Sequence, residues 1–175
     1  MSELVRVLGI DPSLRNTGMA VVSYNTESGF FHKPSHCQVL VNPMKYKGTE
    51  AILNMLDMIS EASQEKCYQE VDVVIVESPP AIFNKNFPAS TLAMLGHISG
   101  GAVALMGLSK SYLFKPTEWN KSRKKEVTHN RTIADLGNVD EWQYNKRVKS
   151  EKYMEHILDA ASMALWWIKE NHVDE

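Results

Sequence analysis

Three acidic residues and one histidine could together perform metal-dependent chemistry. Asp11 ends a β-rich segment, Glu77 ends an apolar segment, and Asp159 lies among apolar residues in a helical segment. His156 precedes Asp159 by three positions, so both side chains project from one face of a helix. Carboxylate oxygens suit Mg²⁺ and Mn²⁺, and one imidazole is compatible with such a site, more so with Mn²⁺. If the four side chains converge, they predict a divalent-cation site.

Each of these residues also has a purely structural interpretation. Asp11 precedes Pro12, and an Asp in that place can simply cap a turn. Glu77 could end its strand in solvent. A histidine in the middle of a helix is more often packed or exposed than a ligand, and Asp159 could face solvent. Whether the four residues form a site depends on the elements that carry them.

The periodicity of the apolar residues predicts these elements. We expect strands at residues 4–10, 17–24, 37–41, 71–77 and 112–114, and helices at residues 48–68, 89–108 and about 150–170. The first three strands suggest an antiparallel meander, and the β-branched run at 71–77 is typical of a strand buried on both faces. This order predicts an α/β fold, a five-stranded mixed sheet with helices on both faces. Strand ends placed side by side would bring Asp11 and Glu77 together, and a helix packed on the sheet would add His156 and Asp159.

Length and composition limit the class of protein. The 175 residues, 43% hydrophobic and 23% charged, predict one globular domain over residues 1–175 and exclude a disordered or fibrous chain. Two cysteines cannot form a disulfide framework, so reduced thiols in a cytosol-like compartment are expected. The first residues show no secretory pattern, and we expect no apolar run near the roughly 18 residues of a membrane span.

Local charge differs from the net charge of −2. Seven basic residues lie between positions 110 and 131: Lys110, Lys115, Lys121, Arg123, Lys124, Lys125 and Arg131. Only Glu118 and Glu126 oppose them in this segment, which is therefore net +5. Such a cluster near an acidic metal site favours phosphate-backbone binding, with Trp119 and Phe83 as candidates to stack on or wedge between bases. The alternative is a solvated face, which is how most charge runs behave.

Several segments carry a family resemblance in the same order along the chain. They are residues 9–13 (GIDPS) with Thr17 and Gly18, residues 74–77 (VIVE), residues 84–86 (NKN) with Ser90, Gly96 and Gly100, and residues 156–161 (HILDAA). Together they resemble the RuvC family of Holliday-junction resolvases, in the ribonuclease H-like superfamily. The first segment alone is also similar to the opening of actin-like ATPases and sugar kinases.

The resemblance implies a ribonuclease H-like fold and a homodimer that cleaves four-way DNA junctions by paired symmetric nicks leaving 5′-phosphate ends. It implies that Asp11, Glu77, His156 and Asp159 form the catalytic, metal-binding set, with two Mg²⁺ or Mn²⁺ ions per site. Asp11 would bridge the ions and His156 would bind metal or position the water. Lys124 or Lys125 would stabilise the scissile phosphate or the leaving group. The helix at 89–108, rich in small residues, is a candidate for the dimer contact, although it could equally pack on the sheet.

The sequence departs from the family pattern in two places. Residues 78–83 are about one residue longer than expected, which leaves open whether Ile82 or Phe83 is the apolar junction-probing residue. The family's Gly-containing loop before its late lysine is replaced by residues 119–125. The expected DNA-binding residues are Ile82, Phe83, Lys85, Trp119, Lys121, Arg123, Lys124 and Lys125.

Parts of the sequence also suggest two other functions. An actin-like or sugar-kinase ATPase requires a second subdomain and further phosphate loops, for which 175 residues are too few. A related nuclease of other branched DNA, or a YqgF-like protein that processes ribosomal RNA, shares the acidic set and stays open. The expected location is the cytoplasm of a bacterium, or of the host cell if the protein is viral, and the sequence does not identify a helicase partner.

Overall fold

The computed structural model describes residues 4–79, 88–121, 123–145 and 151–173. The strands are β1 (Leu4–Asp11), β2 (Asn16–Asn25), β3 (Phe30–Val41), β4 (Val73–Glu77) and β5 (Ser111–Phe114). The α-helices are α1 (Gly48–Ser63), α2 (Lys66–Gln69), α3 (Ala89–Met106), α4 (Pro116–Trp119), α5 (Lys125–Leu136) and α6 (Glu151–His172). Two short 3₁₀ turns, η1 (Leu108–Lys110) and η2 (Val139–Glu141), complete the order.

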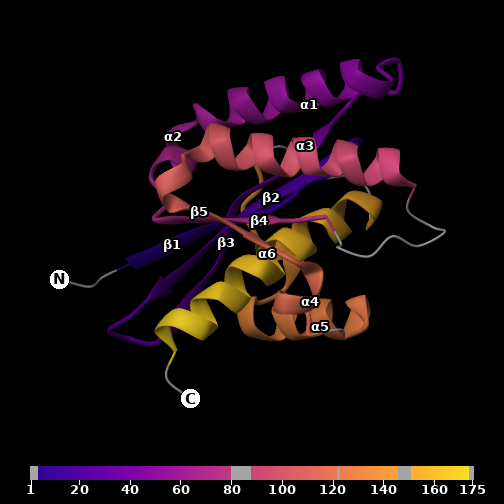
Figure 1. Ribbon diagram of the computed structural model, residues 1–175. Helices are drawn as coiled ribbons and strands as arrows, with labels where there is room; N and C mark the ends of the chain where they lie inside the picture. The colour runs from indigo at the N-terminus through magenta and orange to yellow at the C-terminus, as the bar shows by residue number, and fades with distance from the viewer. Residues whose placement is uncertain (1–3, 80–87, 122, 146–150, 174–175) are drawn as a thin grey trace.

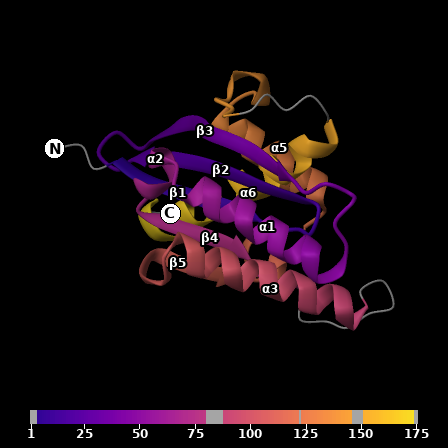
Figure 2. The same ribbon diagram turned by 90° about the horizontal axis from the view of Figure 1, so that it is seen from above.

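The strands form one mixed sheet in the order β3-β2-β1-β4-β5 (Figure 2). β1, β2 and β3 pair antiparallel, which confirms the expected meander. β4 runs parallel to β1, and β5 runs parallel to β4. In the pairing of β1 with β4, Ile10 lies opposite Val76, so the carboxyl ends of these two central strands meet at one edge of the sheet.

Helices cover both faces of the sheet, as the sequence predicts (Figure 1). α1 and α3 lie on one face, and α6 lies on the other with α4 and α5 beyond it. Alternate residues of a strand point to opposite faces. In β1, Leu8 and Ile10 therefore belong to the core beneath α1 and α3, while Val5 and Val7 belong to the core beneath α6.

Some element boundaries differ from those expected. β3 begins seven residues earlier, because a positive φ of 53° at His36 and a register shift against β2 interrupt the alternation that reveals a strand. The helix expected at 48–68 is two helices, α1 and α2, separated by Gln64 and Glu65. α5 was not expected, because its polar residues outnumber the few side chains that it buries.

The expectation that no apolar run approaches 18 residues is wrong for α3. Ala89–Met106 is 18 residues long and is long and apolar enough, by length and composition, to cross a membrane. In the fold this helix packs on α1 and the sheet through Ile98, Ala102 and Met106, which are buried. Most of its other residues are at least partly exposed, so α3 presents an apolar outer face.

α6 approaches the sheet unusually closely at two glycines. A Cβ on Gly9 of β1 would overlap the carbonyl oxygen of Ala160, and a Cβ on Gly18 of β2 would overlap that of His156. Both contacts are with backbone atoms, which cannot rotate away as a side chain can. The absence of a side chain at these two positions therefore lets α6 lie against β1 and β2.

This packing predicts that Gly9→Ala lowers the free energy of unfolding by at least about 2 kcal/mol, because the added methyl group overpacks the contact with Ala160. Asn130→Ala, at an exposed position of α5 and away from this contact, is the control. It should be neutral or stabilising by up to about 0.7 kcal/mol, because alanine has the higher helix propensity. Urea denaturation at one protein concentration compares the two. Equal stability of both variants would contradict the packing argument.

Candidate active site

The two acidic strand ends lie side by side, as predicted. Asp11 is the last residue of β1 and Glu77 the last residue of the parallel β4. Asp11 is 7% exposed and Glu77 is partly buried. Since α6 crosses β1 and β2 at Gly9 and Gly18, its residues reach the same edge of the sheet.

α6 contributes the other two predicted residues. His156 Nδ1 lies 2.7 Å from Asp11 Oδ2, within hydrogen-bonding distance. One turn further on, Asp159 is 9% exposed. The charges of Asp159 and Asp11 act on Glu77 from close by. The structure therefore brings together all four residues that the sequence singles out, and their catalytic roles remain a prediction.

Asp159 is held by two residues of α5. His129 Nε2 lies 2.7 Å from Asp159 Oδ1, and Lys125 Nζ lies 2.7 Å from Asp159 Oδ2. His129 is itself 9% exposed. Both carboxylate oxygens thus have a partner on α5, which fixes the orientation of Asp159 toward that helix.

His129 was not identified from the sequence. A helical reading of residues 125–136 would have placed Lys125, His129 and Thr132 on one face, at spacings of four and three. His129 and Thr132 are indeed buried against α6, where Thr132 Oγ1 hydrogen-bonds Ser162 Oγ at 2.6 Å. This spacing is present in the sequence, but the many charged residues of the segment obscure its helical pattern.

Glu77 is positioned by a tryptophan that was expected to contact DNA. Trp119 Nε1 donates a hydrogen bond to Glu77 Oε1 at 3.2 Å, and the residue is only 6% exposed. On the main chain, Ser99 Oγ donates to the Glu77 carbonyl oxygen at 3.0 Å. The predicted stacking role of Trp119 is therefore corrected, because its indole packs in the core beneath α6 and supports the carboxylate.

The site brings several carboxyl groups together in a place that is largely shielded from solvent. Burial, followed by the charges of Asp11 and Asp159, raises the pKa of Glu77 to about 8. Burial also raises the pKa of Asp11, although the hydrogen bond from His156 opposes that shift. These carboxyl groups resist ionisation together because nothing within the cluster neutralises all of them.

This donor set fits a divalent cation. Hard carboxylate oxygens with mutually raised pKa values are stabilised when a cation shares them. Among the described residues, no three His, Cys, Asp or Glu side chains are yet arranged as a ready-made metal cluster. The reason is visible in the contacts, since Asp11 pairs with His156 while Asp159 pairs with His129 and Lys125.

The basic segment lies on the side of the site formed by α4 and α5. Lys121, Arg123, Lys124 and Lys125 are all exposed. Lys125 lies at the carboxylates, whereas Lys124 precedes the first turn of α5. Of the two lysines considered for the scissile phosphate, the structure favours Lys125 by position. The other expected DNA-binding residues, Ile82, Phe83 and Lys85, lie outside the described residues.

The raised pKa of Glu77 predicts a pH-dependent stability in the absence of divalent cations. The unfolded chain releases this proton near pH 4.5 and the folded protein near pH 8, so the folded state binds more protons between these values. Stability should therefore fall as pH rises from 5 to 8, by at most about 1.4 kcal/mol per pH unit from this group. Urea denaturation in EDTA measures the slope. Glu77→Gln should flatten it, and parallel slopes for both proteins would refute the prediction.

No family model matches the chain, and no curated protein sequence matches it. Solved structures do. Thermus thermophilus RuvC gives a TM-score of 0.65 at 17% identity, covering 97% of this chain and 98% of that chain. T. thermophilus RuvC in complex with a Holliday junction substrate gives 0.64 at 16% identity, covering 96% and 97%. The yeast mitochondrial Holliday junction resolvase Ydc2 gives 0.54 at 14% identity, covering 96% and 82%.

These likenesses extend over nearly the whole chain and over nearly the whole length of both T. thermophilus structures. The five-stranded mixed sheet and the helices on both faces have the same arrangement. The chain therefore has the ribonuclease H-like fold of the RuvC resolvases, as its sequence motifs indicate.

Proposed function

We propose that this protein is a metal-dependent, structure-selective endonuclease that cleaves four-way DNA junctions by paired, symmetric nicks. The observation that carries the proposal is the convergence of Asp11, Glu77 and Asp159 at one sheet edge, with His156 against Asp11. The likeness of fold to proteins described as Holliday junction resolvases supports it.

The four residues at the sheet edge would hold Mg²⁺ or Mn²⁺, two ions per site. Asp11 is the natural shared ligand, because it is the most enclosed of the carboxylates and is affected by the charges of both His156 and Asp159. When bound, such ions activate a water and neutralise charge on the phosphate. The products would be 5′-phosphate and 3′-hydroxyl ends.

The protein's own residues orient the reacting groups. His156, held by Asp11, is placed to position a water or a ligand oxygen at this edge. Lys125 places a half-exposed positive charge beside Asp159, where it would stabilise the scissile phosphate or the leaving oxygen. His129 acts from behind Asp159 and limits its rotation.

A homodimer would supply the two nicks that a junction with near two-fold symmetry requires. The outer face of α3 is the candidate contact, and its glycines support this assignment. Among the described residues, a Cβ on Gly100 meets nothing within 4 Å, and one on Gly96 meets only Pro79 at 4.0 Å. Packing against the described part of the chain therefore does not require glycine at either position, whereas close approach of a second helix would.

The proposal assigns branched DNA as the substrate and the cytoplasm of a bacterium or of an infected cell as the location. A YqgF-like role on RNA uses the same carboxylates, and the substrate test below distinguishes it. The actin-like alternative has no support in a fold that matches resolvase structures over 96% of the chain.

The first prediction of this proposal concerns cleavage. Asp11→Asn, Glu77→Gln and Asp159→Asn should each lower the rate on a labelled four-way junction by at least about 10³-fold, because metal ions contribute several kcal/mol to the transition state. Junction binding should survive, since shape is kept. Glu61→Gln, on the exposed side of α1, is the control and should cleave normally.

The substrates in that assay are the junction, a matched linear duplex and an RNA–DNA hybrid, each with and without Mg²⁺ or Mn²⁺. Cleavage of the junction alone, and only with metal, is the expected result. Wild-type rates for any of the three variants would remove that residue from the site. Preference for the hybrid would replace the junction with an RNA-containing substrate.

The second prediction concerns the dimer. Ala104→Arg places a charge on the exposed face of α3 and should weaken dimerisation at least about tenfold, because an unpaired charge is costly in a helix contact. Ala134→Arg makes the same change on the exposed face of α5 and should leave the dimer intact. Sedimentation equilibrium measures both. A monomeric wild type, or equal dissociation of the two variants, would exclude α3 as the interface.

A further inference from the structure

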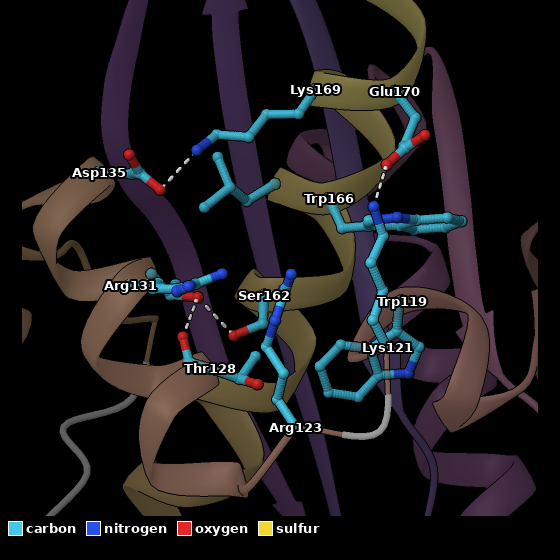
Figure 3. A pocket seen from close by; sticks show the side chains of 12 residues that line it. Trp119, Lys121, Arg123, Thr128, Arg131, Asp135, Ser162, Trp166, Lys169 and Glu170 are labelled. Atoms are coloured by element: carbon cyan, nitrogen blue, oxygen red, sulfur yellow. Dashed lines mark hydrogen bonds and ion pairs between the residues drawn. The ribbon is translucent and has the colours of Figure 1, made fainter.

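A cavity with a volume of about 190 Å³ lies beyond Trp119, between α5 and α6 (Figure 3). Four cationic side chains line it: Lys121, Arg123, Arg131 and Lys169. Two of them already have acidic partners. Lys121 Nζ lies 3.2 Å from Glu170, and Lys169 Nζ lies 2.6 Å from Asp135. In these two pairs the positive charge of each lysine is balanced by a carboxylate, so the excess positive charge of the cavity comes from the two arginines.

Arg123 and Arg131 have no carboxylate partner within the part of the chain that the structure describes. Figure 3 shows the Arg123 side chain extending into the cavity from the segment before α5, and Arg131 at the same cavity on α5. Two like charges at one cavity without a counter-ion repel each other. An anion between them would remove the repulsion, so this arrangement favours a negatively charged ligand.

Two neutral groups at the same cavity also lack partners. Thr128 Oγ1 and Trp166 Nε1 are buried, and neither has a hydrogen-bond partner among the described residues. Both residues line this cavity. A buried polar group without a partner costs about 1–3 kcal/mol. An oxygen-rich anion would offer acceptors to both groups as well as to the guanidinium groups.

The cavity adjoins the acidic site. A smaller neighbouring cavity of about 180 Å³ is lined by Glu77, Lys125 and Asp159. Trp119, Arg123 and Thr128 line both cavities. A path of positive charge therefore leads from the carboxylates, past Lys125 and Arg123, to Arg131.

We propose that the cavity between Arg123 and Arg131, here called the arginine cavity, binds a backbone phosphate of the DNA at a position other than the scissile one. Guanidinium groups suit phosphate oxygens because they present paired N–H donors in a plane. Thr128 and Trp166 complete the donor set. This inference rests on the proposed function, and it adds Arg131 and Trp166, which the sequence did not assign to DNA binding.

The salt dependence of junction binding, measured in EDTA so that no cleavage occurs, tests the arginine cavity. Arg123→Ala and Arg131→Ala should each reduce the slope of log K against log salt by about 0.9, which is the contribution of one lost phosphate contact on duplex DNA. Lys66→Ala is the control. It removes the same charge from α2, where Lys66 pairs only with Glu70 among the described residues, and should leave the slope unchanged.

If the wild type binds the junction and both arginine variants keep its slope, the arginine cavity is not a phosphate site. That outcome leaves the proposed function intact, because the carboxylate variants test it separately. If the wild type does not bind the junction, the proposed function fails. Binding of inorganic phosphate then tests whether the arginine cavity is an anion site.

In that second case the readout is the indole N–H resonance of Trp166 in ¹⁵N spectra at constant ionic strength. Phosphate, compared with chloride, should shift this resonance in the wild type and in Lys66→Ala but not in the Arg123→Ala/Arg131→Ala double variant. The remaining resonances show whether the variant is folded. No shift in the wild type would overturn the proposal.

Discussion

The close approach of α6 to the sheet at Gly9 and Gly18 is the constraint on which the site depends. With no Cβ at either glycine, the backbone of α6 rests against β1 and β2 at Ala160 and His156. That contact sets how far His156 and Asp159 lie from the end of β1. A shift of α6 by the width of a methyl group would separate His156 from Asp11, whose side chains now lie 2.7 Å apart. The two glycines therefore serve the chemistry of the site as much as the packing of the core.

The same approach creates an electrostatic problem that the surrounding residues only partly solve. Burial and mutual repulsion raise the pKa values of Asp11 and Glu77. His156 of α6 lies within hydrogen-bonding distance of Asp11, and Lys125 of α5 forms an ion pair with Asp159. Glu77 accepts a hydrogen bond from the neutral indole N–H of Trp119, and the carboxyl group of Asp11 close by raises its pKa further. Glu77 therefore lies, at the adjoining ends of β1 and β4, where a shared divalent cation would favour its ionised form.

Much of the fold could be predicted because its signals are local. The apolar run of β4 and the helical spacing of apolar residues in α6 can be recognised in the sequence. Glu77 and Asp159 lie at their predicted positions in these two elements. The course of β3 could not be predicted, because the irregular backbone at His36 breaks its alternation. The functions of Trp119 and His129 depend on contacts with residues 42 and 30 positions away. Sequence spacing identified the four central residues but could not identify the residues that support them.

The most direct test of the account is anomalous diffraction from crystals soaked in Mn²⁺, because it locates the ions without reference to activity. The account predicts anomalous density among Asp11, Glu77 and Asp159, within ligand distance of these carboxylates, and its loss in Asp11→Asn. Glu61→Gln crystals, soaked in the same way, should retain it. Manganese bound elsewhere on the surface, with none at the ends of β1 and β4, would contradict the claim that this buried acidic cluster is a metal site.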